Sequence, residues 1–190
     1  MAGQPVNYTR TGETVFSQME KINSELLTMT YGALVMQLLK DSKFLQDVKV
    51  VNAALDKMCV LVSLRVCRGY NIGVRLIDEF LAKSNTQSCS NFKETAQVIA
   101  KVIGFKMFLG ITADVSKWSD DSKQCSLVFK GNPLNDFVEL PSQYSTLNYS
   151  NILCGVIRGA LSMVNMVVEC AYVKDELKGA TESEIRITLK

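Results

Sequence analysis

A single cysteine, Cys89, lies in the middle of a polar stretch, "AKSNTQSCSNFKET" (82–95), between two apolar, helix-like segments. Cysteine prefers burial, whereas turns favour Gly, Asn, Asp and Ser, so a thiol at this place calls for an explanation. From the residues alone, an unused thiol in a turn is favoured over a functional one.

The chain contains no histidine, which excludes Ser-His-Asp and Cys-His catalysis, His-ligated haem and His-containing zinc sites. Its six cysteines include no C-x-x-C pair, so zinc or iron–sulfur ligation is poorly supported. The carboxylates of Asp78 and Glu79 are adjacent and point in different directions on a helix, as expected of a solvated face. No phosphate-binding glycine loop occurs either. We therefore expect an interaction protein that is not an enzyme and has no metal or nucleotide cofactor.

A chain of 190 residues with 47% hydrophobic residues is long enough for one domain with a packed core. Its net charge of +2 does not favour nucleic acid as a partner. The N-terminal residues are too polar for a signal peptide, and the apolar window 152–173 contains Arg158, Asn165 and Glu169, which argue against a bilayer span. These features predict a cytoplasmic protein with reduced thiols.

Apolar residues recur at three- and four-residue steps in several segments, and this spacing predicts helices over 17–40, 46–58, 70–83, 92–103 and 152–164. Two-residue alternation predicts strands over 125–129 and 184–189, and a third strand is expected near 166–177. Residues 1–16 are expected to form a flexible arm, and 17–190 a single domain. The order of elements favours an α+β fold, with helices packed on one face of a small antiparallel sheet.

The glycines Gly155 and Gly159 form a G-x-x-x-G pattern on the last predicted helix. Each glycine costs about 1 kcal/mol relative to alanine inside a helix. Close packing of a neighbouring element, or an apolar channel, would account for this narrow face.

Five phrases occur in order along the chain: "NSELLTMTYGALVMQLLKD", "GYNIGVRLIDEFLAKS", "FKMFLGITADVSKWS", "NPLNDFVELP" and "YSNILCGVIRGALSMV". Together they resemble the blocked-early-in-transport family, subunit three of the TRAPP (transport protein particle) complex. The resemblance spans about 23–189.

The resemblance implies an α+β subunit that forms homodimers, or heterodimers with sibling subunits, on the helices 17–40 and 46–58. It implies assembly with other TRAPP subunits into a vesicle-tethering complex of endoplasmic reticulum-to-Golgi transport, which supports nucleotide exchange on a Rab-type GTPase. The complex would hold the subunit at the surface of cis-Golgi and endoplasmic reticulum membranes. It also implies a covalent fatty acyl chain, palmitate, on Cys89, buried in an internal apolar channel. The channel-lining candidates are Ile72, Leu76, Phe80, Ile99, Ile103, Gly155 and Gly159.

Three features depart from the family pattern. An apolar insert at 59–68 is either a bulge that packs into a groove or a mis-joined coding segment without function, and the second is favoured. Ser88 stands where the family commonly has arginine, which removes a cation beside Cys89. The chain ends at Lys190, where relatives tend to continue, and this predicts a weaker direct contribution to nucleotide exchange. A stand-alone fatty-acyl-binding protein, using the same channel for exchangeable ligand, is the rival hypothesis.

Overall fold

Six α-helices, one π-helix and four strands make up the part of the chain that the computed structural model describes, which comprises residues 8–40, 48–57, 68–84, 89 and 91–190. The helices are α1 (Tyr8–Gln18), α2 (Ser24–Lys40), α3 (Val48–Lys57), α4 (Arg68–Ser84), α5 (Phe92–Val98), the π-helix η1 (Ile99–Met107) and α6 (Ile152–Met163). The strands are β1 (Asp114–Ser116), β2 (Gln124–Phe129), β3 (Val168–Lys174) and β4 (Ser183–Leu189). Short 3-10 turns follow at Pro133–Asn135, Ser142–Tyr144 and Glu176–Lys178.

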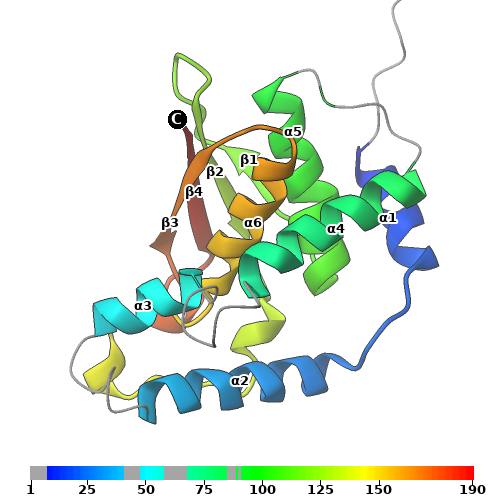
Figure 1. The fold of residues 1–190 in the computed structure, drawn as a ribbon. Coiled ribbons are helices and arrows are strands. Elements are labelled where there is room, and N and C mark those ends of the chain that lie inside the picture. Colours follow the sequence, from blue (N-terminus) through cyan, green and yellow to red (C-terminus); the bar gives the residue numbers. More distant parts are fainter. Residues whose placement is uncertain (1–7, 41–47, 58–67, 85–88, 90) are drawn as a thin grey trace, which may run out of the picture.

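The four strands form one antiparallel sheet in the order β1-β2-β4-β3. Alternate side chains of β2 and β4 face the core, so that Leu127 pairs with Ile185 and Cys125 with Ile187, all fully buried. Helix α6 lies against the sheet, and α4 crosses over α6 (Figure 1). The expected α+β fold, with helices on an antiparallel sheet, is confirmed.

Helix α4 packs on α6 with almost no space between the two backbones. A Cβ atom at Gly73 would lie 2.1 Å from the carbonyl oxygen of Val156 and 2.7 Å from the amide nitrogen of Ala160. Val156 and Ala160 each follow one of the two glycines of the G-x-x-x-G pattern, and both glycines are buried. A closely approaching neighbour, one of the two explanations of that pattern, is therefore present.

The N-terminal part differs from the sequence-based expectation in two ways. The helix predicted over 17–40 starts only at Ser24, where the side chain of Asn23 accepts a hydrogen bond of 2.7 Å from the amide of Glu25; the first two residues of the predicted range end α1 instead. The flexible arm predicted over 1–16 is wrong for residues 8–16, which belong to α1. This helix is ordered by packing, since Gly12 and Val15 are buried against the rest of the protein.

Three further boundaries also differ. The helix predicted over 92–103 is α-helical only to Val98 and continues as η1, because hydrophobic spacing does not reveal the wider π turn. The three-residue strand β1 was not predicted, being too short to show alternation. The strand expected near 166–177 ends at Lys174, where the side chain of Asp175 caps a 3-10 turn. The insert at 59–68 lies outside the described residues, apart from Arg68 at the start of α4.

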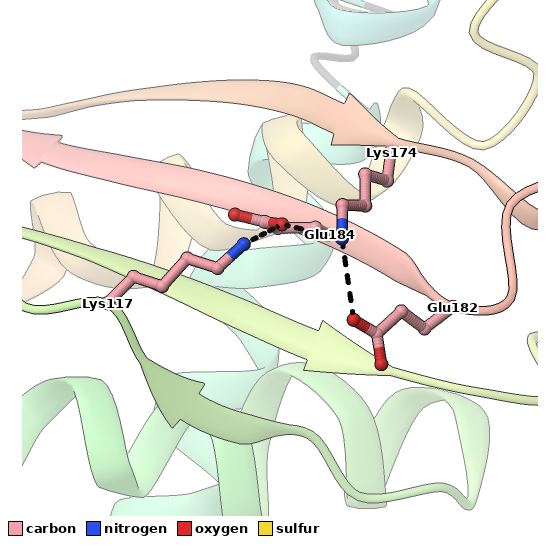
Figure 2. Close-up of polar contacts among 4 residues, drawn as sticks. All are labelled: Lys117, Lys174, Glu182 and Glu184. Carbon is pink, nitrogen blue, oxygen red and sulfur yellow. Dashed lines mark hydrogen bonds and ion pairs between the residues drawn. The ribbon is translucent and has the colours of Figure 1, made fainter.

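The sheet face away from α6 carries a buried carboxylate. Glu184 alternates with the inward-facing Ile185 on β4, yet its side chain is 0% exposed because other side chains cover it. Lys117 donates a hydrogen bond to its Oε2, Lys174 Nζ lies 3.9 Å from the same atom, and Glu182 lies 3.6 Å from Lys174 (Figure 2). Burial raises the pKa of Glu184, but the bonds from Lys117 and Ser126 and the nearby lysine charges outweigh it, so the pKa is lowered.

The substitution Lys117→Met removes the cation but keeps the length of the side chain. We expect it to lower the free energy of unfolding by about 1–2 kcal/mol near pH 7, less than for a fully buried pair, because Lys117 is half exposed. Since the folded-state pKa of Glu184 lies below its ordinary 4.5, its stabilising contribution is complete above that pH and is lost as the pH falls further. The variant should therefore lose less stability on acidification than the wild type in urea unfolding.

The matched control is Lys190→Met, which breaks the exposed pair of Lys190 with Glu169 (2.6 Å). Its effect should stay within about 0.5 kcal/mol. Equal effects of the two substitutions would contradict the importance of Glu184.

Candidate functional site

Cys89 lies where the sequence predicted it, in the connection between α4 and α5. Helix α5 starts at Phe92, because the side chain of Asn91 accepts a hydrogen bond of 2.9 Å from the amide of Glu94. The hydroxyl of Thr95 donates to the carbonyl of Asn91 at 2.9 Å and fixes the same turn. Cys89 itself is half-buried and packs against the hydrophobic core. The residue therefore contacts the apolar core and is neither fully buried nor fully exposed.

The surroundings of Cys89 do not activate its thiol. Burial raises its pKa, and the carboxylate of Glu94 raises it further by repelling the thiolate. A hydrogen bond with the side chain of Thr95 acts in the opposite direction but does not cancel the rise. Because the thiolate is the nucleophile, we expect this cysteine to react slowly at neutral pH.

Two lysines near the turn in the sequence, Lys83 and Lys93, could have replaced a missing arginine. Lys83 instead pairs with Glu79 one helical turn earlier on α4, at 2.6 Å. The Nζ atom of Lys93 lies 6.0 Å from the centre of the Trp118 ring. Neither lysine contributes to the pKa shift of Cys89.

The channel-lining candidates come together where α4, η1 and α6 meet. Leu76, Phe80, Ile99 and Ile103 are buried in one hydrophobic cluster, and Ile72 packs against it half-buried. The remaining two, Gly155 and Gly159, are buried on α6. Five of the seven thus belong to or pack against the hydrophobic core, and the role of all seven as a channel lining stays a prediction.

Sequence reasoning missed three residues of this region. Tyr8 comes from α1, and burial and the neighbouring Cys89 and Glu94 raise the pKa of its phenol. Thr95 and Glu94 adjoin Cys89 in the sequence, and the "N-x-x-E" spacing of a capped helix start could have identified this turn. No sequence signal could have shown that Tyr8 interacts electrostatically with a residue that follows it by 81 positions.

None of the helices in the described ranges is both long and apolar enough to cross a membrane. Within the same ranges, no three Cys, Asp or Glu side chains gather in a way that could hold a metal ion. The candidate site therefore consists of a half-buried cysteine that packs against the apolar core.

A layer of helices on a four-stranded antiparallel sheet, with a turn cysteine against the helical core, defines a class of small α+β domains. Residues 27–188 match the family described as "Transport protein particle (TRAPP) component". The chain belongs to this family.

Relatives of this chain carry subunit-three names. It is 54% identical to trafficking protein particle complex subunit 3 of Dictyostelium discoideum, over 96% of this chain and 91% of the relative. It is 42% identical to subunit BET3 of Saccharomyces cerevisiae, over 94% and 86%. A crystal structure of subunit 3 from Naegleria fowleri, covalently bound to palmitic acid, is similar with a TM-score of 0.78 and 55% identity, covering 90% of this chain and 97% of that one.

The raised pKa of the Cys89 thiol predicts the pH dependence of its reactions. Below that pKa the thiolate fraction grows about tenfold per pH unit, so the initial rate of Cys89 alkylation should rise about tenfold from pH 7 to pH 8. It should still be rising at pH 9.0, the ordinary value for a thiol. The measurement is quantitative mass spectrometry of the peptide that contains Cys89.

The variant Glu94→Gln removes the nearby negative charge, which should move this profile to lower pH and increase the rate severalfold at pH 7. Glu139→Gln, on an exposed loop residue, is the charge-matched control and should leave the profile unchanged. A rate that levels off below pH 8 in the wild type would contradict the raised pKa.

Proposed function

We propose that this chain is a non-catalytic core subunit of a TRAPP vesicle-tethering complex and carries a fatty acyl chain on Cys89. The observation that carries the proposal is its 42–54% identity to TRAPP subunit 3 and BET3 proteins over nearly the whole chain. The position of Cys89 against the apolar core supports the second half of the proposal. So does the palmitate bound to the Naegleria fowleri protein.

The acyl chain would be joined to Cys89 by a thioester bond. The Sγ thiolate attacks the carbonyl carbon of an acyl-coenzyme A, a new carbon–sulfur bond forms, and coenzyme A leaves with its own sulfur. Burying a sixteen-carbon chain yields about 0.8 kcal/mol per CH₂, on the order of 10 kcal/mol in total. Among the apolar helices α4, η1 and α6, the chain stabilises the fold and does not serve as a membrane anchor.

The protein would act through its partners and not through turnover. The chain has no histidine, and a single self-acylation is not catalysis. Within the complex, it supports nucleotide exchange on a Rab-type GTPase during endoplasmic reticulum-to-Golgi transport. Its place at cis-Golgi and endoplasmic reticulum membranes is peripheral and depends on the other subunits.

Intact-mass spectrometry and partner identification test this function together. Protein purified from eukaryotic cells should be heavier than the sequence by one palmitoyl group, and Cys89→Ser should lack this addition. The wild-type protein should also co-purify with a constant set of TRAPP subunits. An exchangeable, non-covalent fatty acid without a stable partner set would instead favour the stand-alone acyl-binding protein.

Helix α2 carries several large apolar side chains that are exposed. Leu26, Met29 and Met36 follow one another along α2 at steps of three and seven residues, and Leu26 and Met29 are 61% and 73% exposed. The exposed Ile22 lies just before the helix. The opposite side of α2 packs on the core through Tyr31 and other buried residues. An apolar row at this spacing is typical of a helix that packs against another helix. It supports the proposed dimer, whether with a second copy or a sibling subunit.

The substitution Met29→Glu should disrupt this dimer by placing a charge at the centre of the row. In sedimentation equilibrium, the wild type should have twice the chain mass of 21.1 kDa, and the variant should approach the mass of one chain. Gln37→Glu, which adds the same charge at an exposed site of α2, should remain dimeric. A monomeric wild type at all concentrations would rule out the homodimer.

A further inference from the structure

An exposed phenylalanine, Phe137, stands on a turn of unusual backbone geometry. Its side chain is 86% exposed, the highest value for a large hydrophobic residue in the described ranges. Its φ angle is +61°, in the left-handed region that bulky residues rarely adopt. A backbone strained in this way persists only where the surrounding structure holds it, and such positions cluster at functional sites. Phe137 is therefore a candidate contact residue.

Hydrogen bonds fix the turn that carries Phe137. The amide of Val138 donates to the carbonyl of Asn135 at 3.2 Å and closes the turn around the exposed ring. From α2, the hydroxyl of Thr28 donates to the carbonyl of Pro133 at 2.7 Å, so the start of the turn lies against this helix (Figure 1). Phe137 is thus held in a fixed position, which lowers the entropic cost of a contact through its ring.

A pocket of suitable size opens where α1 and α2 meet. Its volume is about 210 Å³. For comparison, an apolar cavity of about 150 Å³ is enough to bind benzene. The apolar side chains that line the pocket come from α1, α2, the end of η1 and the turn after β2, and they include Phe16, Met19, Leu27, Met107, Leu109 and Pro133. A phenyl ring therefore fits into this pocket.

The ring of Phe137 is flanked by negative charge. Asp136 precedes it and Glu139 follows two residues later, and both are exposed. Neither carboxylate has an ion-pair partner among the described residues. The turn therefore presents an aromatic ring between two free carboxylates.

The pocket is surrounded by positive charge. The Nζ atoms of Lys21 and Lys106 lie 4.5 Å and 5.2 Å from the centre of the Phe16 ring, which forms part of the pocket wall. One carboxylate, that of Glu20, also lines the pocket, so the two lysines leave a net positive charge there. Pocket and turn are thus complementary both in shape and in charge.

The two features lie in one patch of the surface but do not meet within one chain. Pro133 lines the pocket and also begins the turn, and Phe137 follows it by four residues, a distance of at most about 14 Å. The high exposure of Phe137 shows that its ring does not enter the pocket of its own chain. In a two-fold dimer the same patch of each chain meets the other, so such a ring and pocket can pair twice across the axis.

We propose that Phe137 of each copy inserts into the pocket between α1 and α2 of a second copy and anchors the homodimer. This contact rests on the proposed dimer and adds to the apolar row of α2 a feature that fixes the orientation of the two chains. Asp136 and Glu139 then approach Lys21 and Lys106 of the second copy. An aromatic side chain buried in a pocket is the kind of contact that dominates the affinity of an interface.

The first test is Phe137→Ala in the full-length chain. Because each dimer contains the contact twice, we expect the dimer dissociation constant from sedimentation equilibrium to rise about thirtyfold or more. Met163→Ala is the matched control, since it removes a large side chain that is 45% exposed at the end of α6. It should leave the dissociation constant nearly unchanged. Circular dichroism checks that both variants remain folded.

A mixing experiment tests whether the ring enters the pocket of the other chain. Ser24→Trp places a bulky side chain at the exposed edge of the pocket and should also weaken the homodimer. A heterodimer of Phe137→Ala with Ser24→Trp keeps one intact contact, whereas either homodimer keeps none. Native mass spectrometry of an equimolar mixture should therefore show more heterodimer than random pairing gives.

The outcomes separate this contact from the dimer itself. If Phe137→Ala dimerises as tightly as the wild type, or if the mixture shows no excess of heterodimer, the anchor is refuted while the dimer on α2 stands. A wild type that is monomeric at all concentrations refutes both.

Discussion

Contact between the backbones of α4 and α6 at Gly73 fixes where the other helices can lie. Since no side chain separates the two helices there, α4 sits on α6 at a distance that only glycine permits. The π-helix η1 packs against both of them, and α1 then reaches η1 through a second glycine contact, at Gly12. Glycine inside a helix costs about 1 kcal/mol, which the packing of these layers must offset. Cys89 itself packs, half-buried, against the hydrophobic core that these helices share.

The position of Cys89 at this core explains why a thiol with a raised pKa can still be a suitable acylation site. The burial that raises the pKa of Cys89 also places it against apolar side chains, where an attached acyl chain would be stable. A fully exposed thiol with a lowered pKa would react faster, but its thioester would be open to water and to other thiols. If Cys89 is acylated as proposed, its environment favours retention of the thioester over the speed of its formation.

Sequence patterns correctly predicted those helices and strands that bury one face against the core. The alternation of β2 and β4 and the spacing of α4 and α6 gave their positions to within a few residues, because burial on one side imposes a period. The patterns failed for elements whose structure depends on residues elsewhere in the chain. The packing of Gly12 on Lys101 orders α1, and nothing in residues 8–16 alone reveals that partner. The change from α-helix to π-helix after Val98 leaves no periodic signal. The importance of Cys89 was inferred from family resemblance, since its own neighbourhood predicted only a turn.

Two surfaces of the molecule differ in the kind of contact they can make. On the sheet face away from α6, Glu184 is already paired with Lys117 and Lys174, so a partner would have to displace or desolvate these charges, which is costly. On α2, Leu26 and Met29 expose apolar groups, which a partner can bury without displacing or desolvating any charge. A stable protein contact therefore forms more easily on α2 than on the sheet. If the proposed acyl chain is enclosed among α4, η1 and α6, the apolar groups of α2 remain free to associate with protein, and attachment to membranes would have to come from the assembly.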